Sequence, residues 1–96
     1  MSFVFMVFHW PEPSRAEALA ESMREMRDLL LGTPGCVAVE PPYLTDDGGC
    51  LVGISKWDSK DAFLASGIKL RPPEEIVDGE SRPRQRFFLE EANTSR

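Results

Sequence analysis

The sequence predicts an α+β fold, a ferredoxin-like βαββαβ unit built on one antiparallel sheet, in a single domain of 96 residues. Three observations support this. An apolar run at residues 3–9 opens the chain, two strand-like runs flank a turn at residues 46–49, and each of two helical patterns ends at a glycine. We expect the strand order 4-1-3-2, both helices on one face, and a core spanning about residues 2–91.

The first strand runs from about Ser2 to His9 and is followed by Pro11, which cannot donate to a strand ladder. It is apolar on both faces, since Phe3, Phe5 and Val7 alternate with Val4, Met6 and Phe8. Helices cover one face of a ferredoxin-like sheet, so the second apolar stripe predicts an association surface. The simplest closure is a symmetric homodimer, with the two sheets packed face to face in an α+β barrel.

The first helix is predicted to begin at a capping box, because Ser14 is followed three residues later by Glu17. Gly32 ends it, and Pro34 prevents its resumption. The apolar residues between these limits recur at intervals of four, three and four, which marks one face of an amphipathic helix: Leu19, Met23, Met26 and Leu30.

The middle of the chain predicts a β-hairpin around Asp47-Gly48, with a type I′ turn. This turn pairs Thr45 with Cys50, Tyr43 with Val52, and Val39 with Lys56. The register puts Val37, Val39, Val52 and Ile54 on one face, which we expect to be the core, with Tyr43 on the helix side. Pro41-Pro42 places the first arm of the hairpin at a sheet edge.

The second helix is predicted to start at Asp58 or Ser59, to turn Ala62 and Phe63 inward, and to end at Gly67. Beyond it we expect a long loop at residues 68–83, and a loop of this length is often functional or mobile in so small a domain. A last strand at 84–91 and a polar tail at 92–96 follow.

Composition excludes several classes of function. The net charge of −5 argues against a nucleic-acid partner, which selects basic surfaces. No apolar run approaches the roughly 20 residues that span a membrane. The N-terminus shows no signal-peptide pattern, so a cytoplasmic location is expected. Cys36 and Cys50 fall near opposite ends of the predicted hairpin and have no metal-ligand spacing, so we expect reduced thiols and no bound metal.

Two short motifs resemble the small dimeric α+β barrels grouped with the antibiotic biosynthesis monooxygenases. "TPGC" at 33–36 resembles the family's link into the second strand, and "WDSKDAF" at 57–63 resembles its tryptophan-led entry into the second helix. The resemblance implies a cavity between sheet and helices or at the dimer centre. It also implies that His9, at the end of the first strand, and Trp57 line that cavity.

What the resemblance implies about function is a cofactor-independent monooxygenase-like protein acting on a small aromatic or polyketide-like compound. The haem-degrading members are expected to carry an iron-ligating histidine on or after the second helix, and "AFLASGIKL" has none. The alternative is a non-catalytic dimeric protein that binds a small apolar molecule or has an accessory role. Whether the chain is an enzyme stays open at this point.

The candidate site residues follow from these two readings. His9 is the candidate general base, since an imidazole accepts a proton near neutral pH; the alternative is a strand-end histidine bonded to backbone. Trp57 and Phe88 are candidate pocket walls, with a structural plug as the alternative for Trp57. Arg84 and Arg86 both belong to the predicted last strand, and one of them, with Arg86 preferred, is a candidate oxyanion donor or carboxylate clamp. The alternative is a solvent-facing arginine that pairs with Glu40 or Glu90. Ser55 completes the substrate-binding set, although no hydrolytic triad is indicated.

Overall fold

The computed structural model describes residues 2–92. Its elements follow the predicted order, with a short 3₁₀ turn before the first helix and with the second strand divided in two. They are β1 (Phe3–His9), the 3₁₀ turn (Pro13–Arg15), α1 (Ala16–Leu31), β2 (Cys36–Val39), β3 (Tyr43–Leu44), β4 (Leu51–Trp57), α2 (Lys60–Ala65) and β5 (Gln85–Glu90).

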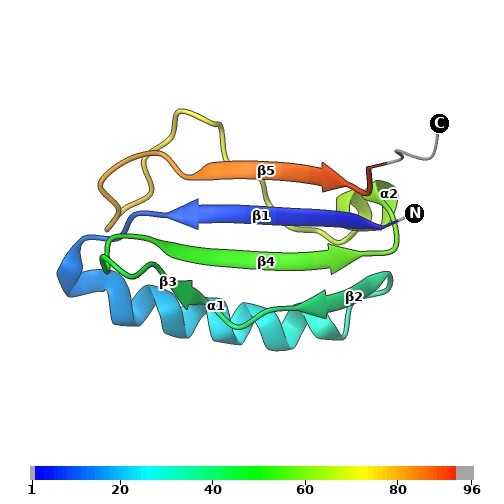
Figure 1. Cartoon of the computed structure of the whole chain (residues 1–96), viewed down its shortest axis with the longest axis horizontal. Helices are drawn as coiled ribbons and strands as arrows, with labels where there is room; N and C mark the ends of the chain where they lie inside the picture. The colour runs from blue at the N-terminus through cyan, green and yellow to red at the C-terminus, as the bar shows by residue number, and fades with distance from the viewer. Residues whose placement is uncertain (1, 93–96) are drawn as a thin grey trace.

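The sheet has the order β2-β4-β1-β5, and β3 continues the edge that β2 begins. All of its pairings are antiparallel. Since β2 and β3 together form the predicted second strand, the predicted order 4-1-3-2 is confirmed. Figure 1 shows α1 and α2 behind the same face of the sheet, which leaves the other face open. Pro41-Pro42 interrupts the outer strand, as expected of proline at a sheet edge.

The helix-facing side of the sheet alternates along β1 and β4. Directly opposed pairs on this side are Phe3 with Trp57, Phe5 with Ser55, Val7 with Gly53, and His9 with Leu51. At one end, α2 covers a core of three fully buried aromatic side chains: Phe3, Trp57 and Phe63. At the other end of these strands stands His9, so the same face holds a packed core and the candidate site.

The hairpin register agrees with the prediction only next to the turn. Tyr43 pairs with Val52 as predicted, but Val39 pairs with Ser55 instead of Lys56. The outer strand carries one residue more than β4 across the segment that contains Pro41-Pro42. A proline cannot complete the ladder there, so the strand bulges and the register shifts.

The predicted core face of the hairpin is wrong for Val52 and Ile54, whereas Val39 lies opposite Ser55 on the helix side, as predicted. Val52 and Ile54 alternate with residues that face the helices, so they point to the open side of the sheet. Tyr43 lies opposite Val52 and is half exposed, hence it is not on the helix side. Gly53 and Ser55, which alternate with them along β4, point toward the helices instead.

Two local predictions at helix and turn are corrected as well. Ser14 does not cap α1, because Pro13–Arg15 form a 3₁₀ turn and Arg15 takes the cap position without a side-chain hydrogen bond. The hairpin turn is not type I′, since among its residues only Gly48 has positive φ, at 77°. In α2, by contrast, the predicted cap is confirmed: Ser59 Oγ accepts a hydrogen bond from the Ala62 N–H at 3.1 Å.

The long loop after α2 is fixed at its far end to the chain that follows β1. Figure 1 shows it returning from α2 to the opposite end of the sheet. The Glu12 N–H donates to the Gly79 carbonyl and the Ser81 N–H to the Trp10 carbonyl, both at 2.8 Å. These two hydrogen bonds hold Glu80, the residue between Gly79 and Ser81, close to His9.

Candidate functional site

A cavity of about 710 Å³ lies between the helix-facing side of the sheet, α1 and the first half of the long loop. Its wall is mainly apolar, including Phe5, Val7, Leu19, Met23, Leu30 and Ile68. Pockets for drug-sized ligands run from about 300 to 1,000 Å³, so a small polycyclic molecule fits by volume. The structure thus provides a candidate binding site on the helix side of the sheet.

Small residues on β4 keep this cavity open. Gly53 lies at its floor, where an added Cβ would stand 3.2 Å from Met23 Cε and 3.3 Å from Val7 Cγ1. Ser55, two residues on, is the next side chain on the same face and also lines the cavity. A larger residue at either position would fill the space between sheet and α1.

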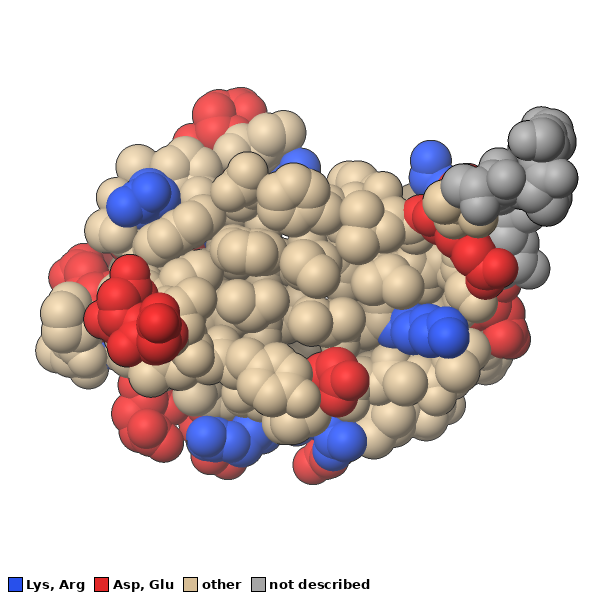
Figure 2. Space-filling view, in the orientation of Figure 1, with Lys and Arg blue, Asp and Glu red and all other residues tan. Residues whose placement is uncertain are grey.

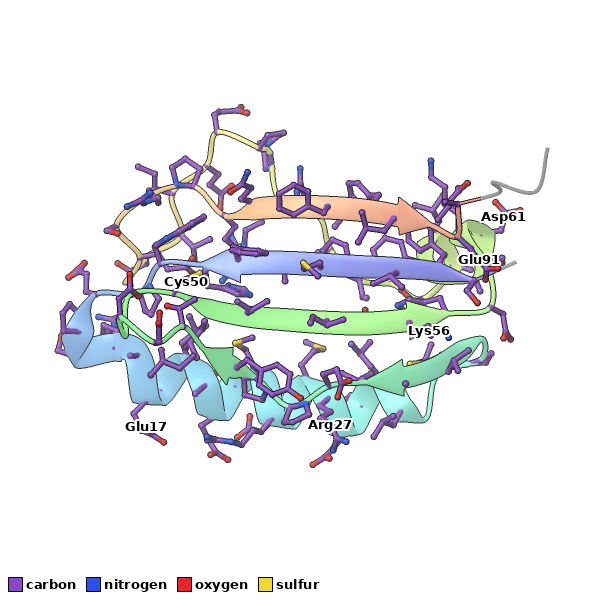
Figure 3. All side chains as sticks on the ribbon, viewed as in Figure 1. Glu17, Arg27, Cys50, Lys56, Asp61 and Glu91 are labelled. Atoms are coloured by element: carbon purple, nitrogen blue, oxygen red, sulfur yellow. The ribbon has the colours of Figure 1, made fainter. Side chains whose placement is uncertain are left out.

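His9 lines the cavity and is buried, with 6% of its surface exposed. Its Nδ1 has no hydrogen-bond partner and lies 3.9 Å from Glu80 Oε1, beyond hydrogen-bonding distance. Burial, followed by the positive charge of Arg84, lowers the pKa of His9 from 6.5 to about 4, although Glu80 acts in the opposite direction. The imidazole is therefore neutral at pH 7. Cys50, labelled in Figure 3, marks this end of the sheet.

Glu80 and Arg84 form the ion pair beside His9. Glu80 is buried, and its two carboxylate oxygens accept three hydrogen bonds from Arg84: Nε at 3.1 and 3.0 Å, and Nη2 at 2.7 Å. Arg84 lines the cavity, so this pair connects the ligand space to the histidine. Glu80 was not predicted as a site residue, because a glutamate inside an irregular loop carries no periodic signal.

Three further arginines line the cavity: Arg71, which pairs with Glu75, and Arg27 and Arg86, which bond to backbone carbonyls. Arg86 Nη1 donates to the Arg71 carbonyl at 2.8 Å, and Arg27 Nε donates to the Val39 carbonyl at 2.7 Å. Arg27 is labelled in Figure 3, on α1. Within residues 2–92, neither Arg27 nor Arg86 forms an ion pair with a carboxylate. Both therefore leave positive charge for an anionic group of a ligand.

The remaining sequence-predicted residues divide between wall and core. Ser55 lines the cavity and accepts a hydrogen bond from Trp57 Nε1 at 2.9 Å. Trp57 itself is fully buried and packs edge-to-face on Phe63, with ring centroids 5.7 Å apart. Phe88 packs against Phe5 at 5.5 Å, on the helix side of β5, and is partly exposed. Trp57 and Phe88 thus stand behind residues of the cavity wall.

The described part of the chain offers no group of three or more histidine, cysteine, aspartate or glutamate side chains placed to hold a metal ion. Across residues 2–92, no helix has the length and apolar character needed to cross a bilayer. Cys36 and Cys50 are both free.

Comparison with known proteins gives matches in structure only. No protein-family model matches the sequence, and no curated protein does. A solved structure called an antibiotic biosynthesis monooxygenase superposes with a TM-score of 0.74 at 11% identity, over 95% of this chain and 99% of that one. The chain has the fold of the antibiotic biosynthesis monooxygenases. At this identity the likeness concerns the fold alone.

Two other solved structures with this fold are described by activity. The monooxygenase ActVA-Orf6 of Streptomyces coelicolor, in complex with nanaomycin D, has a TM-score of 0.69 at 17% identity, over 97% of this chain and 89% of that one. A mutant of SnoaB, a cofactor-independent oxygenase from Streptomyces nogalater, has a TM-score of 0.69 at 16% identity, over 98% of this chain and 96% of that one. The predicted resemblance is therefore confirmed at the level of the fold.

Proposed function

We propose that this chain is a cofactor-independent monooxygenase-like protein that acts on a small aromatic or polyketide-like compound. The observation that carries the proposal is a buried imidazole on the wall of an apolar cavity of about 710 Å³. The solved structures add support, since one neighbour is described with bound nanaomycin D and another as a cofactor-independent oxygenase.

In the proposed reaction, His9 acts as the base. Its Nε2 takes a proton from an acidic CH₂ group of an anthrone-like substrate, and the carbanion gives its electrons to dioxygen. The resulting peroxide loses water and leaves a ketone, so CH₂ and O₂ become C=O and H₂O. Arg86 stabilises the oxyanion that develops on the substrate, Ser55 contacts the ring system, and Trp57 and Phe88 support the wall.

The proposed reaction places a demand on His9. A base works best with a pKa near the operating pH, and the pKa of His9 without ligand is about 4. This value specifically favours the second candidate function, a non-catalytic protein that binds a small aromatic or apolar molecule in the same cavity. For the proposed oxygenation, ligand binding has to raise the pKa of His9 and so make it a stronger base.

We also propose a homodimer that closes over the open face of the sheet. Figure 2 shows this face, and over the strands it is almost free of charged side chains. By alternation along the strands, Lys56 lies on this face together with its apolar members, which are Val4, Met6, Phe8, Tyr43, Val52, Ile54, Phe87 and Leu89. Monomers rarely leave so contiguous an apolar surface uncovered.

The two free thiols support the further proposal of a cytoplasmic location.

Oxygen uptake with anthrone tests the proposed activity. Purified wild-type protein in buffer with chelator is expected to consume oxygen faster than buffer alone and to form anthraquinone. His9→Gln is expected to lose about 100-fold or more of the protein-dependent rate, the usual contribution of a general base. Glu17→Gln, whose side chain is 91% exposed on α1, is the control and is expected to keep it. Binding without uptake would support the non-catalytic reading instead.

A further inference from the structure

Three side chains at the His9 end of the cavity form an arrangement that the proposed reaction does not explain: His9, Glu80 and Arg84. His9 and Glu80 are both buried, and Nδ1 of His9 lacks a hydrogen-bond partner although Glu80 Oε1 lies only 3.9 Å away. Arg84 holds both oxygens of that carboxylate. The Glu80 carboxylate thus lies beside both the Arg84 guanidinium and the His9 imidazole, but it accepts hydrogen bonds only from Arg84.

A buried polar nitrogen without a partner costs free energy, so its retention beside a carboxylate needs a reason. If His9 takes up a proton, both ring nitrogens carry hydrogen and Nδ1 must donate. Closing the 3.9 Å gap to the roughly 2.8 Å of a charge-assisted hydrogen bond needs about 1 Å of movement. Side-chain rotation supplies this, while the backbone hydrogen bonds at Gly79 and Ser81 keep Glu80 in place.

We propose that Glu80 is a positioning residue for His9: its carboxylate accepts a hydrogen bond from Nδ1–H of the imidazolium, and Arg84 competes with His9 for that carboxylate. The inference rests on the proposed function, because it describes how His9 becomes a stronger base during the reaction. Arg84 lines the cavity, so an oxyanion of the substrate gives it a second partner on that side. As Arg84 turns toward the ligand, Glu80 becomes available to His9.

Besides burial, the charges that shift the pKa of His9 are those of Arg84 and Glu80. Arg86, on β5, lines the same cavity and is bound to a backbone carbonyl. The Cys50 thiol precedes β4 and stays neutral, since burial raises its pKa. The α1 residues on this wall carry no charge at the His9 end: Leu19, Ser22 and Met23.

The test is the pKa of His9, followed by NMR of the imidazole in the full chain without substrate. His9 is the only histidine, so its signals need no assignment. In Arg84→Gln the pKa is expected to rise by about one to three pH units, because the buried carboxylate then faces only His9. Arg84→Lys keeps the charge and is expected to remain closer to the wild type.

The decisive comparison repeats Arg84→Gln in a Glu80→Gln background. Removing the arginine charge raises the pKa of His9 somewhat in either background. When Glu80 is present its carboxylate also becomes available to His9, so there the rise is expected to be larger by at least about one pH unit. Equal rises in both backgrounds would overturn the proposal. Arg71→Gln is the matched control, since Arg71 pairs with Glu75 at the same spacing in the same loop. A rise in that variant as large as in Arg84→Gln would also overturn it.

The result is separable from the proposed function, because no turnover is measured. If anthrone oxidation fails while the His9 titration behaves as expected, the oxygenase is wrong and the Glu80 competition stands. If oxidation succeeds while Glu80 has no effect on the His9 pKa, the competition is wrong and the oxygenase stands.

Discussion

Burial of His9 makes the stability of the fold depend on pH in a predictable direction. The pKa of His9 is about 4 in the folded chain and close to 6.5 when unfolded. Between these values the unfolded chain binds a proton that the native state does not. Stability from this group is therefore complete above pH 6.5 and falls as the pH drops toward 4.

The size of the effect follows from the gap of about 2.5 pH units between the two pKa values. At about 1.4 kcal/mol per pH unit, the full effect is about 3 kcal/mol, and most of it is reached by pH 4.5. His9→Gln removes the titrating group while keeping a polar side chain of similar reach. The variant should therefore lack the contribution of His9 to the pH dependence of the free energy of unfolding, and it should keep the contribution of the carboxylates.

Urea unfolding at pH 7.5 and pH 4.5, followed by tryptophan fluorescence, measures the difference. Trp57 is fully buried and reports on the core. Wild type is expected to lose about 2 to 3 kcal/mol more than His9→Gln between the two pH values. Carboxylate titrations occur in both proteins and cancel in the comparison.

An equal loss of stability in wild type and variant would refute the reasoning, because it would mean that His9 titrates alike in the folded and unfolded chain. A larger loss in the variant would refute it too. Native-like circular dichroism of His9→Gln at pH 7.5 is the control for folding.

Three other substitutions test separate parts of the structure. Ser55→Ala leaves the Trp57 indole N–H without its buried partner, so urea unfolding should show a loss of about 1 to 3 kcal/mol; an unchanged stability would contradict the hydrogen bond. Phe87→Glu charges the open sheet face and is expected to give a monomer by sedimentation, whereas Leu64→Glu on α2 should stay dimeric; a monomeric wild type would end the dimer proposal. Arg86→Gln is expected to weaken binding of anthraquinone-2-carboxylate by about 10-fold or more in calorimetry, and unchanged affinity would remove Arg86 from the site.

Much of the fold could be predicted from local sequence signals. The glycine and proline positions mark the ends of elements, and Pro41-Pro42 alone places the outer strand at an edge, as observed. The same prolines also explain the main error. A bulge adds one residue to the outer strand, and nothing local in the sequence says on which side of the prolines the register is kept.

The candidate site was predicted less completely than the fold. His9, Ser55 and Arg86 line the cavity, while Trp57 lies in the core beside it. Glu80 was missed because its place depends on backbone hydrogen bonds between the loop and the residues after β1, which are about 70 positions apart in the chain. Tertiary contacts of this kind leave no periodic pattern in a sequence.

The central claim is that the cavity between the sheet and α1 binds an aromatic ligand beside His9. NMR titration with anthraquinone-2-carboxylate, an unreactive planar anion, tests it most directly, because the single imidazole and the two indoles give distinct signals. We predict that the His9 signals shift with saturation and that the Trp57 indole, sealed in the core, changes little. A saturable titration that leaves His9 unmoved, or no binding at all, would contradict the claim.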